Sequence, residues 1–247
     1  MSERTHKQLQ AIILIGLGAF LFYKILSGTL YFYINARFTW LVVLGGVILL
    51  ALAFFAWPRP GLAHAHSHDE DAHEHAHSHS VWPLLVLCVP LALGFLVPAR
   101  PLDSSALDTR GLTTNALASF GSQAAVQLDQ PSDQRNVLDW VRAFNFATDP
   151  VIYEGEAADV VGFVYQDQRL PEGQFLVGRF AVSCCAADAF AVGMIVQSGE
   201  ASRWQANQWV HVSGTVQVSY LDGVPMPLIL AESIKEVDIP PQPYLFP

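Results

Sequence analysis

Two apolar segments near the amino terminus constrain this chain more than any other feature. Residues 11–30 read AIILIGLGAFLFYKILSGTL, with Lys24 as their one charge, and residues 40–57 read WLVVLGGVILLALAFFAW with no charge. About 20 apolar residues in a helix cross a hydrocarbon core that is about 30 Å thick. We therefore expect both segments to cross a membrane.

A third apolar segment, residues 81–97 (VWPLLVLCVPLALGFLV), is shorter and contains Pro83 and Pro90. Proline in a lipid-facing helix frees a backbone carbonyl, so we expect this helix to be kinked and packed against a neighbour. A cleaved signal peptide does not explain the first segment, because its apolar stretch is too long and no small-residue cleavage site follows it. The chain is predicted to cross the membrane three times.

Three spans put residues 58–80 on the side of the amino terminus and the carboxy-terminal part on the other side. Each side of the membrane has three basic residues near the expected spans, so the positive-inside rule barely favours one orientation. These are Arg4, Lys7 and Arg59 on the first side and Arg37, Arg100 and Arg110 on the second. Because the first sixty residues are basic and the remainder is acidic, we expect the carboxy-terminal domain to lie outside the cytoplasm.

Seven histidines gather in residues 61–80, GLAHAHSHDEDAHEHAHSHS, between the second and third apolar segments. They are His64, His66, His68, His73, His75, His77 and His79. Neutral imidazole binds borderline ions such as Zn²⁺, Ni²⁺ or Co²⁺, and the small residues between the histidines let the loop fold around an ion. No fixed four-ligand spacing is present. The loop therefore either binds several ions loosely or is a solvated low-complexity linker.

Residues 132–247 carry the patterns of a folded domain. Ser132 is a candidate N-cap for a helix that ends before Pro150. From Asp159 the apolar period changes to two, which indicates strands. The expected strands are residues 160–165, 175–183, 190–197, 209–218 and 226–236. Five short strands after one helix predict a mainly-β domain, either an OB-like small barrel or a sandwich.

The chain thus divides into a transmembrane anchor at residues 1–100, a polar linker at 101–131 and a soluble mainly-β domain at 132–247. The last domain is acidic and has few Lys or Arg residues. OB-like modules that bind nucleic acid need a basic groove with stacking aromatic side chains. Nucleic acid is therefore not an expected partner.

Cys184 and Cys185 lie in SCCAADA, between two expected strands and just ahead of Asp188. Two thiolates and a carboxylate suit a metal such as zinc, but adjacent residues on a strand face opposite ways, so both thiols reach one ion only at a bend. His211, on the polar face of its strand, is the candidate fourth ligand. The alternatives are a reactive thiolate, or thiols that pack in the barrel with His211 as a surface residue.

Six motifs occur in order along the chain. They are YIN (33–35), PLDSSALDTRG (101–111), GFVY (162–165), GRFAVSCCAADA (178–189), VGMIV (192–196) and WVHVSGT (209–215). With these motifs the chain resembles the YcgQ-like family of two-component membrane permease subunits. The resemblance implies a multi-pass protein of the bacterial plasma membrane that pairs with a multi-spanning permease subunit, and some members are connected with zinc supply. Others have His at the position of Cys184, and His and Cys are both ligands for such ions.

The leading hypothesis is therefore an accessory subunit of a permease complex that handles divalent metal ions. The expected spans contain no Asp or Glu and only Lys24 as a charge, so they are a poor transport path without a partner. The alternative is a membrane-anchored metal sensor or chaperone that acts without a permease. A thiol enzyme is not expected, because no recognisable catalytic spacing, phosphate loop or HExxH motif accompanies the cysteines. Zinc or another divalent transition metal is the one expected cofactor.

Overall fold

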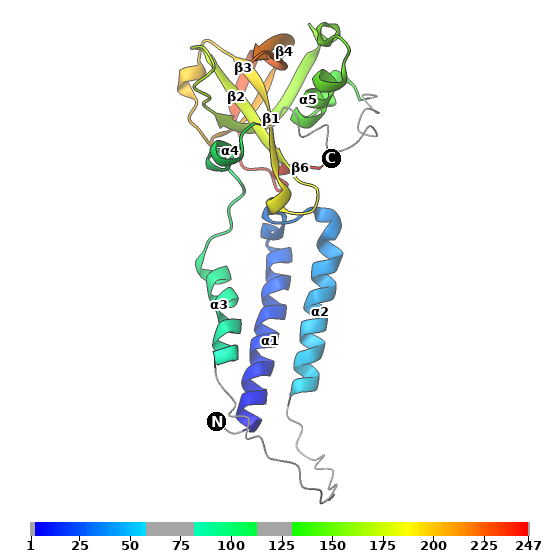
Figure 1. The fold of residues 1–247 in the computed structure, drawn as a ribbon, viewed down its shortest axis with the longest axis vertical. Coiled ribbons are helices and arrows are strands. Elements are labelled where there is room, and N and C mark those ends of the chain that lie inside the picture. The colour runs from blue at the N-terminus through cyan, green and yellow to red at the C-terminus, as the bar shows by residue number, and fades with distance from the viewer. Residues whose placement is uncertain (1–2, 58–81, 113–129, 247) are drawn as a thin grey trace, which may run out of the picture. The chain divides into compact units, whose positions relative to one another are not determined.

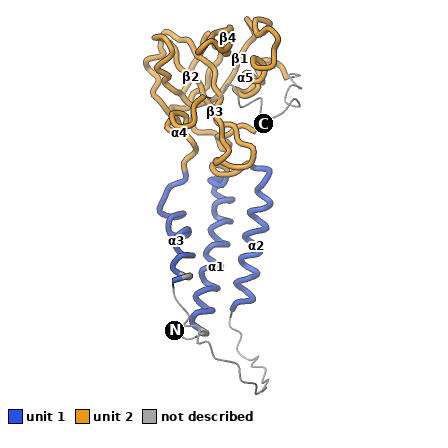
Figure 2. The backbone as a smooth tube through the Cα atoms, viewed as in Figure 1, with its two compact units in different colours: residues 1–30, 36–99 blue, residues 31–35, 100–247 orange. Residues whose placement is uncertain are grey.

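The computed structural model describes most of the chain. The described residues are 3–57, 82–112 and 130–246. They fall into two compact units, which Figure 2 distinguishes by colour. Unit 1 comprises residues 1–30 and 36–99, and unit 2 comprises residues 31–35 and 100–247. Unit 2 is therefore assembled from two pieces of chain that are far apart in sequence.

Unit 1 consists of the helices α1 (Glu3–Leu26), α2 (Thr39–Ala56) and α3 (Trp82–Leu96) (Figure 1). Among the described residues, Thr5–Leu26 and Ala36–Ala56 are long and apolar enough to cross a membrane. Length and composition thus support the first two predicted spans. The helix at the third predicted span, 81–97, is shorter and does not meet the same test.

The first helix has different limits from the predicted span at 11–30. It begins at Glu3, because polar residues ahead of the apolar stretch continue the helix, and it ends at Leu26. Gly28 follows with a φ of 72°, a left-handed conformation that glycine adopts at low cost just past a helix end. The next apolar residues form the short 3₁₀ helix η1 (Thr29–Phe32).

α1 and α3 pack closely where Gly94 faces the ring of Phe20. A Cβ atom at Gly94 would lie 2.4 Å from the ring of Phe20, which is closer than real Cβ atoms approach. The Phe20 ring also meets the Phe95 ring edge-on, with 5.1 Å between the centroids. Small residues at helix contacts are typical of helices that associate in lipid. α3, which contains Pro90, thus packs against a neighbour, as expected.

Unit 2 contains a six-stranded mixed sheet. Its strands are β1 (Ala157–Tyr165), β2 (Gln174–Ala181), β3 (Phe190–Gln197), β4 (Trp209–Leu221), β5 (Val224–Glu236) and β6 (Tyr244–Leu245). β1 pairs with β4 and also with β2, so the order β1-β4-β5-β3-β2 leads back to β1. The β3–β5 and β2–β6 pairs are parallel and the other pairs are antiparallel. The five predicted strands are all present, and β6 is an addition.

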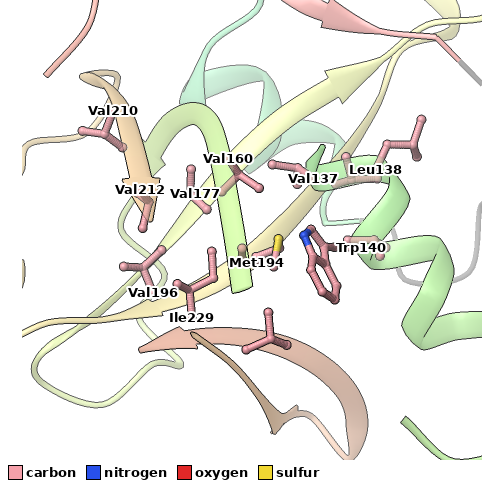
Figure 3. Close-up of a cluster of buried hydrophobic side chains, with 14 of the residues drawn as sticks. Val137, Leu138, Trp140, Val160, Val177, Met194, Val196, Val210, Val212 and Ile229 are labelled. Carbon is pink, nitrogen blue, oxygen red and sulfur yellow. The ribbon is translucent and has the colours of Figure 1, made fainter. Parts of the chain in front are cut away.

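The main core cluster joins residues from all five long strands to α5 (Val137–Phe146), and Figure 3 shows Trp140 of this helix beside Met194 of β3. Val210, Val212 and Val216 of β4 are fully buried, as the period of two predicts, and Val218 on the same face is partly buried. The register of β4 with β5 shifts between Ser213 and Gly214, because β5 has one extra residue there, and a Cβ atom at Gly214 would lie 2.1 Å from the carbonyl oxygen of Leu230. Glycine is therefore required at this bulge.

The helix ahead of the sheet starts later than predicted. Ser132 opens the short 3₁₀ helix η5 (Ser132–Gln134), and Asn136 is the N-cap of α5. The Asn136 side chain accepts hydrogen bonds from two backbone amides, and the Asp139 carboxylate accepts one in return from the Asn136 amide. This reciprocal pair satisfies more free amides than a serine alone, so the predicted N-cap at Ser132 is wrong by about one turn.

The short helix α4 (Ser104–Arg110) lies in the segment that the sequence assigns to a linker at 101–131. Its Leu107 is 2% exposed and belongs to a second core cluster. The other buried members are Phe163, Phe180, Val182, Ala189, Ala191, Trp209 and Tyr244. The described part of that segment up to Leu112 therefore belongs to unit 2. A helix of seven residues is too short to reveal itself by an apolar period.

Candidate metal centre in the cysteine loop

Residues 183–189, the cysteine loop, connect β2 to β3. The chain bends at Ser183 and Cys184 and then forms the single turn η7 (Ala186–Asp188). Cys185 caps this turn, because its sulfur accepts a hydrogen bond from the Asp188 amide while the Asp188 carboxylate accepts one from the Cys185 amide. This reciprocal capping holds the two side chains next to each other.

The bend brings two thiols and one carboxylate into a single group. The sulfur of Cys184 lies 3.6 Å from that of Cys185, and the ligand atoms of both residues and of Asp188 lie within 4.8 Å of one another. The sulfurs are much farther apart than the roughly 2.05 Å of a disulfide, so both are free thiols. Adjacent thiols can reach one ion only at a bend, and the bend is present.

Three backbone amides hold the carboxylate of Asp188. The amide of Ser183 donates to Oδ1 at 3.0 Å, and those of Cys184 and Cys185 donate to Oδ2 at 2.7 Å and 3.4 Å. Partial burial pushes the pKa of Asp188 upward, but hydrogen bonds from the Cys184 side chain and from these amides outweigh it and keep the pKa below its ordinary value. The carboxylate is therefore ionised at neutral pH.

The thiol of Cys184 is held in its protonated form. Its hydrogen bond to Asp188 and its contact with Cys185 raise the pKa of this thiol to about 12. A cation that binds here must displace the proton, because the thiolate is the form that ligates metal. The group can therefore exchange a proton for a soft cation.

His211 lies outside this group. Its Nε2 contacts the carboxylate of Asp159 on β1, and the side chain is partly exposed. Within the part of the chain that the structure describes, the possible ligands that come together are those of Cys184, Cys185 and Asp188. His211 was the candidate fourth ligand, and the structure does not bring it to the thiols. Strand register, which decides this point, cannot be read from one sequence.

The predicted ligands of the histidine-rich loop lie outside the described residues. These are His64, His66, His68, His73, His75, His77 and His79. They stay a prediction, and the site that the structure describes is the cysteine loop alone.

The segment Tyr31–Asn35 lies along the cysteine loop within unit 2. Ile34 and Cys185 form an antiparallel bridge, and the Ala186 amide donates to the carbonyl of Tyr33 at 2.8 Å. The Asn35 amide donates to the carbonyl of Cys184 at 3.0 Å, and the Asn35 side chain donates to that of Ser183 at 3.1 Å. Sequence reasoning did not assign a role to these residues, which entered only as the motif YIN.

Arg110 holds the other end of the cysteine loop. Its guanidinium donates to the carbonyls of Ala186 at 3.1 Å and Ala189 at 2.9 Å. The loop backbone is therefore fixed by two segments that precede it in sequence by many residues, while the Cys184 thiol stays exposed.

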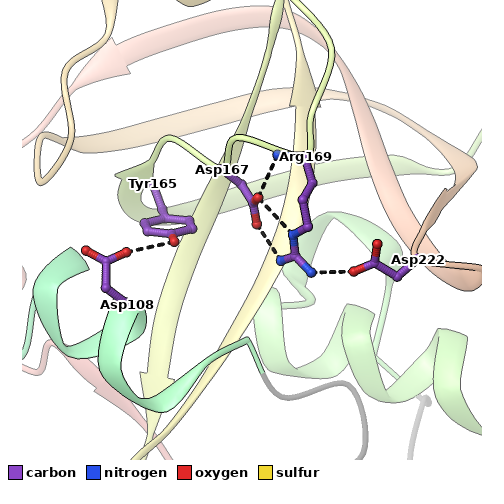
Figure 4. Close-up of polar contacts among 5 residues, drawn as sticks. All are labelled: Asp108, Tyr165, Asp167, Arg169 and Asp222. Atoms are coloured by element: carbon purple, nitrogen blue, oxygen red, sulfur yellow. Dashed lines mark hydrogen bonds and ion pairs between the residues drawn. The ribbon is translucent and has the colours of Figure 1, made fainter.

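A second polar cluster lies between α4, the β1–β2 connection and the β4–β5 turn (Figure 4). Arg169 binds Asp167 through two nitrogens and also contacts Asp222, and the hydroxyl of Tyr165 donates to Asp108 at 2.8 Å. A cavity of about 460 Å³ adjoins these residues. Partial burial and the hydrogen bond to Asp108 raise the pKa of Tyr165 to about 12. These side chains pair with one another, so the cluster links the β1–β2 side of the sheet to α4 and to the β4–β5 turn.

Two family descriptions match the chain. The DUF1980 N-terminal domain matches residues 9–113, and the DUF1980 C-terminal domain matches residues 122–247. A relative from Streptococcus mutans serotype c, named "Putative two-component membrane permease complex subunit", is 22% identical over 95% of this chain and 97% of its own length. The "UPF0703 protein YcgQ" of Bacillus subtilis strain 168 is 22% identical over 66% of this chain and 67% of its own length.

Two solved structures show a weaker likeness. A small single-stranded DNA-binding protein from Streptomyces coelicolor has a TM-score of 0.23 and 12% identity, over 34% of this chain and 93% of its own. A DUF3299 family protein from Pseudomonas aeruginosa PAO1 has a TM-score of 0.24 and 13% identity, over 52% of this chain and 84% of its own. Both scores are too low to define the fold or a ligand.

Proposed function

We propose, because this chain belongs to the DUF1980 family, that it is an accessory subunit of a two-component membrane permease complex. The observation that carries the proposal is the extent of the likeness to the Streptococcus mutans relative. That likeness covers 95% of this chain and 97% of the relative, so it includes both the apolar helices and the sheet. The relative's name describes a permease complex subunit, and the proposal extends that role to this chain.

A third membrane span at residues 81–97 is part of the proposal. Residues 31–35, which connect α1 to α2, belong to the same unit as residues 100–247. If α1 and α2 each cross the membrane, the chain leaves α2 on the opposite side from residues 31–35. It must cross once more before residue 100 to rejoin its unit. The apolar segment 81–97 is the stretch available for that crossing, and its prolines are tolerated where neighbouring helices satisfy the freed carbonyl.

The proposed location is the bacterial plasma membrane, with unit 2 outside the cytoplasm. The named relatives are both bacterial. The orientation is chosen from the acidic excess after residue 60, a weaker signal than the basic residues near the spans, which number three on each side. In this orientation the histidine-rich loop at 61–80 faces the cytoplasm and the cysteine loop faces away from it.

An OB-like barrel is the proposed form of the sheet. The ring of pairings can be read as β1-β2-β3-β5-β4, with β3 and β5 parallel and every other neighbour in the ring antiparallel. Five strands in a partly open Greek-key barrel are the hallmark of OB folds. A sandwich would leave edge strands on both sheets, whereas each of these five strands has a neighbour on both sides.

A multi-spanning partner is proposed as the transport path. α1, α2 and α3 contain no Asp between them, and Glu3 at the very start of α1 is their one acidic residue. Intramembrane ionisable residues usually mark ion pathways, so these helices are suited to anchoring and assembly. The accessory subunit would then present ions to the partner.

Divalent metal is the proposed cargo, and zinc or a similar soft ion is the best match to the cysteine loop. Two thiols and one carboxylate lie within 4.8 Å of one another, with Cys184 and Asp188 exposed and Cys185 partly exposed. Soft thiolates select zinc-like or copper-like ions over Mg²⁺ or Ca²⁺. Three protein ligands leave a fourth position for exchange, which suits a carrier better than a closed structural site. The seven histidines at 61–80 would collect ions on the other side of the membrane.

The alternative function is a membrane-anchored metal sensor or chaperone that acts without a permease. The same cysteine loop supports it, because three ligands can hold an ion for either purpose. An enzyme is not proposed, since the raised pKa of Cys184 makes that thiol a weak nucleophile at neutral pH.

Purification of the tagged full chain from its own membranes tests the proposal. We expect a multi-spanning membrane protein in equal amount, identified by mass spectrometry, and bound zinc in the complex. Replacing both Cys184 and Cys185 by serine should remove the zinc of the cysteine loop, while Cys88→Ser, the matched control, should not. A metal-loaded chain without a partner would favour the sensor or chaperone. Unchanged metal after both replacements would reject the cysteine loop as a site.

A further inference from the structure

Asn35 is a buried polar residue in an unusual position. It is 5% exposed, and it lies in the short connection between two apolar helices, where polar side chains ordinarily face water. In unit 2 it contacts the cysteine loop, 148 residues further along the chain. The burial of Asn35 is therefore explained by the groups of the cysteine loop to which it is hydrogen-bonded.

Two successive peptide groups of the cysteine loop lie between Asn35 and Asp188. In the peptide that joins Ser183 to Cys184, the carbonyl accepts from the Asn35 side chain and the amide donates to Asp188. In the next peptide, from Cys184 to Cys185, the carbonyl accepts from the Asn35 amide and the amide donates to the same carboxylate oxygen. Each peptide group is thus held at both ends, and rotation of either one would break a bond on each side.

We propose that Asn35 is a positioning residue for the group formed by Cys184, Cys185 and Asp188. By fixing the two peptide groups that flank Cys184, it fixes the direction of this side chain and the amides that hold the carboxylate. Residues that support ligands in this way commonly change metal affinity about 10–100-fold when they are replaced.

The position of Asn35 in the chain adds a second consequence. The residue is covalently continuous with α1 on one side and α2 on the other. Any movement that withdraws the connection between these helices from the cysteine loop releases both peptide groups together. The ligand group is thereby linked to the connection between α1 and α2, and Asn35 is the residue of that connection that holds both peptide groups. This inference rests on the proposed metal function for its ligand, but its geometry does not depend on metal.

The test uses the full chain in lipid nanodiscs, in a Cys88→Ser background so that thiolate absorption reports the cysteine loop. Cd²⁺ is the probe, followed by its thiolate charge-transfer band. Asn35→Ala removes the side-chain donor, and Asn35→Asp replaces it with an acceptor facing the Ser183 carbonyl. Asn145→Ala is the matched control, because Asn145 also donates to a backbone carbonyl, that of Val141 at 2.8 Å, but on α5. We expect both Asn35 variants to bind Cd²⁺ about tenfold more weakly than the control while the chain still unfolds cooperatively on heating.

Hydrogen exchange of the peptide covering residues 182–189, without metal, gives a second measurement. We expect its amides to exchange about tenfold faster in Asn35→Ala than in Asn145→Ala. If both Asn35 variants match the control in Cd²⁺ affinity and in exchange, the positioning role is rejected while the metal site stands. If the unmodified chain shows no Cd²⁺ band, the proposed metal function is rejected, and the exchange rates alone decide the role of Asn35. Faster exchange in Asn35→Ala supports it, and equal exchange overturns it.

Discussion

Removing residues 100–131 should cost unit 2 most of its stability. A fragment of residues 132–247 keeps all six strands and α5 but loses α4, whose Leu107 is 2% exposed in the second core cluster. Truncating a buried leucine typically costs about 2–5 kcal/mol. The fragment also loses the hydrogen bonds of Arg110 to two loop carbonyls and of Asp108 to Tyr165, at about 0.5–1.5 kcal/mol each. Domains are commonly stable by only about 5–15 kcal/mol.

Urea unfolding followed by tryptophan fluorescence measures this cost. Both a fragment of residues 100–247 and the shorter fragment contain Trp140, Trp204 and Trp209, and both lack residues 31–35, so the comparison isolates residues 100–131. With a slope of about 1–3 kcal/mol per M, a loss of about 2–5 kcal/mol in Leu107→Ala of the longer fragment should lower the midpoint by about 0.7–5 M. Thr109→Ala, on the exposed side of α4, is the control and should change stability by less than about 0.5 kcal/mol. Equal midpoints for the two fragments would refute the reasoning.

Three further outcomes are expected. Asp188→Asn should speed alkylation of Cys184 at pH 9, measured by peptide mass spectrometry. Loss of the negative neighbour lowers the pKa of this thiol from about 12 and so raises the thiolate fraction, and an unchanged rate would contradict this cause. Gly214→Ala should destabilise the full chain by at least about 1–3 kcal/mol in thermal unfolding, because its Cβ atom would clash with the Leu230 carbonyl. Gly199→Ala is the control and should be nearly neutral, because its Cβ atom would meet no atom within 4 Å. Arg179→Met should speed hydrogen exchange in residues 240–246, because the Arg179 guanidinium donates to two carbonyls of that tail. This guanidinium is buried, and burial lowers its pKa to about 10. Equal exchange in the variant and the unmodified chain would show that β6 alone holds the tail.

Apolar patterns predicted the elements whose residues repeat with one period over a long enough stretch. The strands from Ala157 to Glu236 lie within about three residues of the predicted limits, because alternate residues face a core and the others face outward. The apolar helices at 11–30 and 40–57 were predicted for a different reason, an unbroken apolar stretch about long enough to cross a hydrocarbon core. The family resemblance is also confirmed, since its motifs are spread over nearly the whole chain.

What the sequence could not predict depends on contacts between distant residues. α4 has one buried side chain, so no period marks it within the segment 101–131. At the site, SCCAADA predicted the thiols and the carboxylate, which the structure brings together. His211 was predicted as a fourth ligand only because it lies on the polar face of its strand, whereas the register of β4 with β1 places it beside Asp159. Asn35 carried no chemical signal, because its role comes from the two carbonyls that it meets.

The origin of unit 2 from two separate pieces of chain governs how the protein is made. Asn35 leaves the ribosome 148 residues before Ser183, which at about 5–20 residues per second is an interval of about 7–30 s. During that interval α1 and α2 can enter the membrane while the strands that will receive Asn35 do not yet exist. Closure of such a long loop is a late folding event. The cysteine loop can therefore acquire its final geometry only after residues 183–188 have been made, when α1 and α2 are already complete.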